Sequence, residues 1–160
     1  MVDPTWNGGI SETRRVIGEY QLSDKDILGC RDFDDTIGIQ GWPVEAHVSG
    51  DVKFVFTPPG SRGYNQIPYR IIVPRKVDNL FVAGRCASMT HDGQSSARVS
   101  GPCFIMGQAA GTAADLALAG NVAPRRIDVC ELQQRLERDG VNLGRAPAAA
   151  HAVAAESPSR

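Results

Sequence analysis

The sequence LFVAGRCASMTHDGQSSARVSGPCFIMGQAAG, residues 80–111, decides the fold that we predict for this chain. Its first five residues form a short apolar run between a turn and a glycine, which predicts a buried, parallel strand. A polar loop follows, and Gly101-Pro102 then opens a helix, because proline suits the first helical turn. Open α/β sheets bind ligands at the carboxyl ends of their strands, and a helix N-terminus offers free N–H groups to an anionic group. The stretch therefore predicts a ligand site between the strand and the helix.

Patterns on either side of this stretch predict further elements. Runs rich in β-branched and aromatic residues predict strands at 14–22, at 51–57, where apolar side chains alternate as in a half-buried strand, and at 69–73. Ser23 and Asp128 are each followed three positions later by an acid, which is the spacing of a helix N-cap. We therefore expect one short helix after Ser23 and a second, polar helix after Asp128.

The two C-terminal helices differ in character. The helix that opens at the Gly-Pro pair is small or apolar nearly all round up to Leu118, so we expect it to be buried on most sides and to end at Gly120. Cys103 in its first turn is interpreted as a packed thiol, with a reactive thiolate as the alternative. The polar helix carries one apolar stripe and should end at Gly140.

Length and composition fit one globular domain. The chain has 160 residues, a net charge of -1 and 42% hydrophobic residues. Acids and bases are interspersed, whereas a nucleic-acid-binding face needs clustered basic residues, so we expect no nucleic-acid partner. The four cysteines form no CxxC pair; we expect no metal site and interpret the thiols as reduced and mostly packed. The most apolar stretch, 99–118, is too polar to span a membrane and no apolar leader is present, which predicts a soluble, cytoplasmic protein.

A series of short motifs, in a fixed order, resembles a known family. The motifs are IPYR (67–70), Val73-Pro74, NLFVAGR (79–85), Thr90-His91, Arg98-Val99 and GQAAGTAA (107–114). In this order they resemble the C-terminal portion of the FAD-dependent oxidoreductases that share a glutathione-reductase-like flavin fold. The resemblance runs from about residue 11 to residue 144, and the succession of motifs is far more specific than any one of them.

The resemblance implies a cofactor role for the strand-loop-helix. Gly84 and Arg85 would approach the ribityl and pyrophosphate region of FAD, and the start of the helix would aim its N–H groups at the N1–C2=O edge of the flavin. The residues implied to bind the cofactor are Gly84, Arg85, Arg98, Val99, Ser100, Gly101 and Pro102.

The same resemblance suggests catalytic and substrate residues. His91 is a candidate proton donor or substrate contact, and Arg98 is a candidate cation that stabilises charge beside the flavin. The alternatives are a loop histidine bonded to its neighbouring aspartate and an arginine in a structural salt bridge. Tyr69, Arg70 and Gln94 are candidate substrate contacts, with strand packing and an ordinary polar loop as the alternatives.

One element of a complete flavoenzyme is missing from the sequence. No GxGxxG fingerprint for the ADP half of FAD occurs in it. We therefore expect a larger partner chain to carry the nucleotide-binding half, and this chain alone to be inactive and to bind FAD weakly or not at all. The predicted function is that of the C-terminal part or small subunit of an FAD-dependent oxidoreductase, which completes the flavin and substrate pocket for hydride transfer to or from a small organic substrate. The alternative is a non-catalytic remnant that serves as an assembly or binding module.

The predicted fold class is α/β. Residues 77–144 would be the C-terminal part of an incomplete, Rossmann-like FAD-binding domain, and residues 11–76 would be part of a β-rich substrate domain. Residues 1–10 are expected to form a lead-in loop. Residues 145–160 contain no sizeable apolar residue beyond one valine, which predicts a disordered tail.

Overall fold

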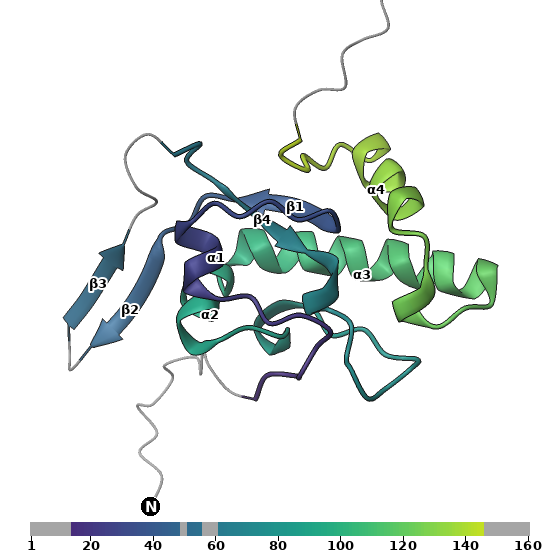
Figure 1. Ribbon diagram of the computed structural model, residues 1–160, viewed down its shortest axis with the longest axis horizontal. Coiled ribbons are helices and arrows are strands. Elements are labelled where there is room, and N and C mark those ends of the chain that lie inside the picture. The colour runs from purple at the N-terminus through teal and green to yellow at the C-terminus, as the bar shows by residue number, and fades with distance from the viewer. Residues whose placement is uncertain (1–13, 49–50, 56–60, 146–160) are drawn as a thin grey trace, which may run out of the picture.

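A computed structural model describes residues 14–48, 51–55 and 61–145 of the chain (Figure 1). Its elements are α1 (Asp24–Leu28), β1 (Thr36–Gln40), β2 (Val44–Val48), β3 (Asp51–Val55), β4 (Asn65–Pro68), the 3-10 turns η1 (Tyr69–Ile71) and η2 (Gly84–Cys86), α2 (His91–Ala97), α3 (Ser100–Gly120), η3 (Pro124–Arg126) and α4 (Val129–Arg138). The predicted lead-in loop, residues 56 and 57 of a predicted strand, and the predicted tail after residue 145 lie outside the described residues.

Two small antiparallel sheets stand beside one long helix. β1 pairs with β4, with Gln40 opposite Asn65, and this pair crosses α3 (Figure 1). β2 and β3 form a hairpin to one side, with Val44 opposite Val55. The strand expected at 51–57 is confirmed as far as residue 55, but Phe54, which the alternation places on the buried face, is 49% exposed. Helices mixed with antiparallel strands are compatible with the predicted α/β class.

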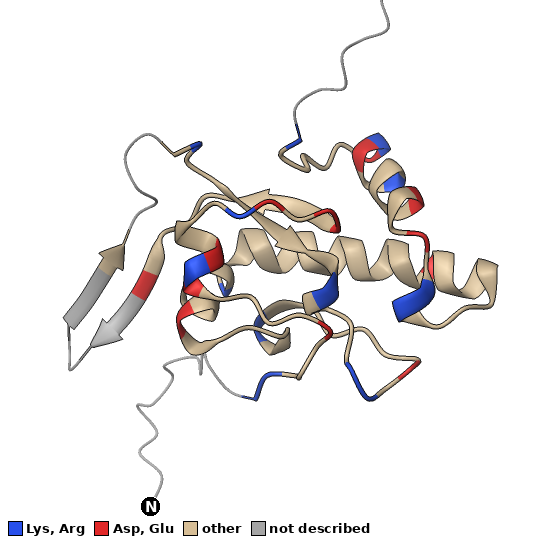
Figure 2. Cartoon of the chain, in the orientation of Figure 1, with Lys and Arg blue, Asp and Glu red and all other residues tan. Residues whose placement is uncertain are grey.

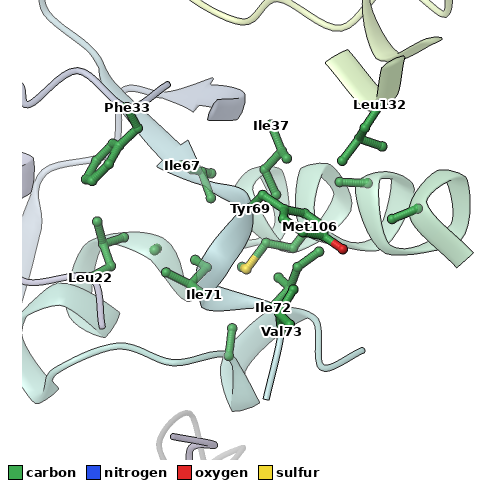
Figure 3. Close-up of a cluster of buried hydrophobic side chains, with 14 of the residues drawn as sticks. Leu22, Phe33, Ile37, Ile67, Tyr69, Ile71, Ile72, Val73, Met106 and Leu132 are labelled. Atoms are coloured by element: carbon green, nitrogen blue, oxygen red, sulfur yellow. The ribbon is translucent and has the colours of Figure 1, made fainter. Parts of the chain in front are cut away.

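The hydrophobic core lies between the β1–β4 pair and α3. Met106 and Ala109 are fully buried on one face of α3, and Ile37 of β1 and Ile67 of β4 are fully buried opposite them. Figure 3 shows the Ile37, Ile67 and Met106 side chains gathered in this layer, with Leu132 reaching in from α4. The apolar stripe predicted for the polar helix is thus confirmed as a core contact.

The opposite face of α3 is uncovered among the described residues. Phe104 is 75% exposed and Leu118 is 82% exposed. Gly107 and Gly111 are also exposed, and because all four positions recur at helical spacing they share this face. The expectation that the helix is buried on most sides is therefore wrong: α3 buries one face and presents a second, nearly uncharged one.

The predicted helix starts are confirmed. The Ser23 hydroxyl accepts a hydrogen bond from the Asp26 N–H. The Asp128 carboxylate accepts hydrogen bonds from the Cys130 and Glu131 N–H groups. Gly140 has a left-handed φ of 86° just after α4, as a helix stop requires. Gly120, however, still belongs to α3, and the left-handed cap is Asn121 with a φ of 48°.

The strand predicted at 69–73 is wrong, because Asp35 bends the chain there. The Tyr69 N–H donates to the Asp35 carbonyl at 2.7 Å, and the Arg70 N–H donates to the Asp35 carboxylate at 2.9 Å. These two bonds hold residues 69–71 in a 3-10 turn. The neighbouring strand, β4, ends one residue earlier, at Pro68.

Two further predicted strands, at 14–22 and 80–84, are absent from the described residues. Residues 14–22 make only isolated bridges, one of them between Gly18 and Pro74. In the second segment the Val82 N–H donates to the Ile72 carbonyl at 2.9 Å, but no ladder forms and Leu80 is 43% exposed. The expected buried, parallel strand is therefore wrong: the run is irregular and only partly buried, although Phe81 packs against the core.

The length of α3 raises the question of a membrane span. Within the described part of the chain, no helix combines the length and the apolar character that crossing a bilayer requires.

Asp26→Ala is expected to lower the free energy of unfolding by about 2 kcal/mol at neutral pH. Its buried carboxylate accepts from the Ser23 N–H at 3.0 Å, the Ser23 hydroxyl at 2.8 Å, the Tyr20 hydroxyl at 2.9 Å and Arg31 at 3.2 Å. Burial by itself raises the pKa of Asp26, but these hydrogen bonds outweigh it and hold the pKa below its ordinary value.

A carboxyl whose pKa is lowered on folding stabilises the protein above its unfolded pKa, and this contribution is lost as the pH falls through the folded pKa. Urea unfolding of the wild type and of Asp26→Ala should therefore differ more at pH 7 than near pH 2. An equal difference at the two pH values would contradict the role given to the charged carboxylate.

Candidate functional site

A groove lies at the start of α3. One side consists of the end of β1 and the two residues after it, and the other consists of Val99 and the first turns of α3. Its volume is about 620 Å³, which falls in the range of roughly 300–1,000 Å³ that is usual for small-molecule sites. The lining residues are Ile39, Gln40, Gly41, Trp42, Val99, Ser100, Gly101, Pro102 and Ile105.

The first turn of α3 is open toward this groove. The N-cap is Val99, whose side chain makes no capping hydrogen bond, and both Ser100 and Gly101 are exposed. The first N–H groups of a helix have no carbonyl acceptor within it, and Pro102 has no N–H. In this first turn, the N–H groups of Ser100 and Gly101 are therefore left without an acceptor inside the helix. A Cβ added to Gly101 would meet no atom within 4 Å. The helix start is therefore accessible, with its positive dipole end facing the groove.

The turn η2 lies against the same end of α3. Gly84 has a left-handed φ of 74°, and a Cβ there would stand 3.7 Å from the Cys103 sulfur. The Arg85 Nε donates to the Arg98 carbonyl at 3.3 Å. The structure thus brings together all the residues predicted to bind the cofactor, Gly84, Arg85 and residues 98–102. Their contact with FAD stays a prediction.

Cys103 is a packed thiol at this corner. It is half-buried, and its Sγ lies 3.4 Å from the Arg98 carbonyl. Burial raises the pKa of the thiol, and the positive charge of Arg85 offsets this only in part. The half-buried thiol thus matches the interpretation of Cys103 as a packed residue. Across the chain the four cysteines are free, as expected, but Cys86 and Cys130 are exposed, so the expected packing holds for half of them.

The two predicted catalytic residues stand at opposite ends of α2. His91 is the first residue of this helix and is exposed, whereas Arg98 caps its C-terminus. A helix of seven residues is roughly 10 Å long, so the two side chains start from points about that far apart. Arg98 is only 12% exposed and lies 3.8 Å from Glu45 of β2, beside the groove. Neither residue lines the groove, but Arg98 directly precedes the lining residue Val99, whereas His91 lies at the other end of α2.

The three predicted substrate residues do not line the groove. The Tyr69 hydroxyl donates to the Pro124 carbonyl at 2.7 Å, beyond the far end of α3, and burial raises its pKa. Figure 3 shows its ring among the core side chains. Arg70 makes a two-point pair with the Asp35 carboxylate, at 2.9 and 3.1 Å. Both residues thus match the alternative of structural packing.

Gln94 also has a structural role, and it lies in a helix rather than in the loop that was predicted. It lies inside α2 and is 1% exposed. Its Nε2 donates to the Arg85 carbonyl at 2.6 Å and its Oε1 accepts from Arg15 at 3.0 Å. Gln94 therefore holds η2 in place against α2, and supports the groove corner from behind.

Sequence reasoning missed the other wall of the groove, formed by the turn at residues 39–42. Trp42 is 45% exposed there. Below it, buried Gln40 donates to Asn65 at 2.6 Å and to Ser96 at 2.7 Å. The only local signal is the Gly41-Trp42-Pro43 triplet, in which an aromatic residue stands between two turn formers.

The fold and this groove define a small α/β-type protein with an aromatic and aliphatic cleft that opens on a helix N-terminus. A family model described as FAD dependent oxidoreductase matches residues 6–136, and the chain belongs to that family. No curated protein and no solved structure matches the chain. FAD is the cofactor that the family implies, and an aromatic residue together with a helix start that has no side-chain cap is a lining compatible with a planar ring that carries carbonyl groups. Among the described residues, no group of three or more His, Cys, Asp or Glu side chains is arranged to hold a metal ion.

Proposed function

We propose that this chain completes the flavin and substrate pocket of an oxidoreductase together with a larger chain that carries the nucleotide-binding half. The observation that carries the proposal is the open groove at the start of α3, in a chain whose family is FAD-dependent. The larger chain would hold the ADP half of FAD, because no GxGxxG fingerprint occurs in this sequence. The reaction is hydride transfer to or from a small organic substrate.

The groove would act on the flavin through its electrostatics. FAD supplies the two-electron chemistry of the reaction. The N–H groups of Ser100 and Gly101 would bind the carbonyl edge of the ring, where a helix N-terminus stabilises negative charge by about 0.3–2 kcal/mol. Gly84 and Arg85 lie beside this turn, where the chain of the cofactor would leave the ring. The protein thus orients the ring and favours its reduced form.

The exposed face of α3 supports docking of the larger chain. Phe104 and Leu118 are the most exposed large apolar side chains of the described residues, and Leu80 adds to them. Figure 2 shows charged residues on α1, α4 and the loops, whereas α3 is nearly free of charge. The apolar run 80–83 belongs to no strand of the described residues and makes one backbone bond, from the Val82 N–H to the Ile72 carbonyl. A sheet of the larger chain could take up this run as a strand and cover the glycines of α3.

Arg98→Ala is expected to slow flavin reduction in the assembled enzyme roughly tenfold and to leave folding intact. A cation beside the ring stabilises developing negative charge, although the nearby Glu45 carboxylate, 3.8 Å away, offsets part of its field. Stopped-flow reduction of the bound flavin measures the effect. Arg70→Ala, which removes an arginine that pairs with Asp35 outside the groove, is the control and should leave the rate unchanged. His91, at the exposed far end of α2, takes part in catalysis only if the substrate extends to that end.

Reconstitution tests the proposed function. The chain is co-expressed with a larger GxGxxG-bearing polypeptide encoded next to it and is purified through a tag on the 160-residue chain. The expected product is a yellow complex in which the flavin is reduced by substrate. A colourless, well-folded chain that takes up no FAD with such a polypeptide would favour a non-catalytic binding module.

A further inference from the structure

Trp42 is fixed in place although its ring is exposed. Its N–H donates to the Gln40 Oε1 at 3.0 Å, its carbonyl accepts from the Ser96 hydroxyl at 2.7 Å, and its indole N–H donates to the Glu45 carboxylate at 3.2 Å. Yet Trp42 is 45% exposed, and it lines the groove. An exposed aromatic ring without a function needs no such support.

The supports of Trp42 are themselves rigid. Gln40 is 5% exposed and Ser96 is fully buried, and the Gln40 Nε2 donates to the Ser96 hydroxyl at 2.7 Å. These bonds join β1 to α2 underneath the indole. Bonds to these two supports hold the backbone of Trp42, and the bond to Glu45 holds its ring, so the residue loses little conformational entropy when a ligand stacks on it.

Glu45 links Trp42 to the predicted cofactor corner. One carboxylate oxygen accepts from the indole N–H, and the other lies 3.8 Å from the Arg98 guanidinium. Arg98 in turn ends α2 one residue before the N-cap of α3. The orientation of the indole and the position of the helix start are therefore set by one connected group of side chains.

We propose that the indole of Trp42 is the aromatic wall against which the isoalloxazine ring stacks, and that Glu45 is the residue that positions this wall. The inference rests on the proposed function, which places the flavin ring in the groove. Trp42 is the one aromatic residue of the lining, so it supplies the flat surface that a planar ring binds best. Stacking on an aromatic side chain also fixes the angle of the ring relative to the helix start.

The test is a titration of the full 160-residue chain with lumiflavin, the ring without its ribityl and phosphate groups. The chain has two tryptophans, so Trp6→Phe leaves Trp42 as its sole indole. We expect lumiflavin to quench the Trp42 emission. Flavin fluorescence anisotropy then gives the affinity of variants: Trp42→Ala should bind about tenfold more weakly, and Trp42→Phe should stay within about threefold of the parent.

Two further variants separate positioning from general packing. Glu45→Ala should lower the emission anisotropy of Trp42 and weaken lumiflavin binding about threefold, because it frees the indole without removing it. Phe104→Ala removes an exposed aromatic residue that does not line the groove, and it should change neither quantity. Lumiflavin binding that is unaffected by Trp42→Ala would overturn the inference and leave the proposed function standing. A lack of quenching up to the solubility limit of lumiflavin would also overturn it, whereas the proposed function is judged separately by FAD uptake in the complex.

Discussion

Replacing Gly93 with alanine is expected to prevent α2 from packing and to lower the free energy of unfolding by at least about 3 kcal/mol. Gly93 is buried in the first turn of α2, where an added Cβ would collide with the Leu22 carbonyl group and stand 3.1 Å from the Ser23 Cα. These are backbone atoms, and they cannot move aside. The Leu22 N–H donates to the Ser88 carbonyl at 3.1 Å, and the Leu22 carbonyl accepts from the Thr90 N–H at 2.8 Å.

Gly111→Ala is the matched control for this effect. Gly111 lies on the exposed face of α3, and a Cβ there would meet nothing within 4 Å. Alanine in a helix interior is about 1 kcal/mol more favourable than glycine, so this variant should be as stable as the parent or slightly more so. Urea unfolding followed by circular dichroism compares the two. A Gly93→Ala protein within 1 kcal/mol of the parent would show that α2 does not pack on residues 22–23 as described.

Local signals in the sequence were sufficient for the starts of α1 and α4, but α2 was missed, because the stretch that forms it was predicted as a polar loop. The caps at Ser23 and Asp128 depend on side chains three residues from the groups that they satisfy, so spacing alone predicted them. The strand predicted at 69–73 failed because Asp35, more than 30 residues away, holds the Tyr69 and Arg70 N–H groups. Such a contact overrides local β propensity, and no periodicity in the segment itself reveals it.

The candidate site was predictable only where one continuous stretch forms it. Residues 84–85 and 98–102 meet because η2, α2 and α3 follow each other directly, so the order of motifs was enough to bring them together. Trp42 and Gln40 come from a turn some 60 residues before the start of α3, and only the pairing of β1 with β4 carries them to it. Gln94 was predicted to be a polar loop residue, because a short helix of mostly polar residues shows no hydrophobic periodicity.

Gly101→Leu is expected to weaken binding of the flavin ring roughly 30- to 100-fold while leaving the stability of the chain within about 1 kcal/mol. Gly101 is exposed and lines the groove, and a Cβ added to it would meet no atom beyond its own helix turn within 4 Å, so a leucine there fits the folded chain and fills the ring site instead. Lumiflavin titration and urea unfolding measure the two quantities separately.

Gly107→Leu provides the matched control, because Gly107 is equally open and exposed but lies two turns further along α3, outside the groove lining. This variant should bind lumiflavin as the parent does. Gly107 lies on the face of α3 where we propose that the larger chain docks. The Gly107→Leu variant should therefore reduce co-purification of that chain. Gly101→Leu should have the reverse pattern, with ring binding lost and the chain–chain contact kept. If both leucines affected ring binding equally, the groove at the start of α3 would not be the site where the ring binds, because only one of the two residues faces it.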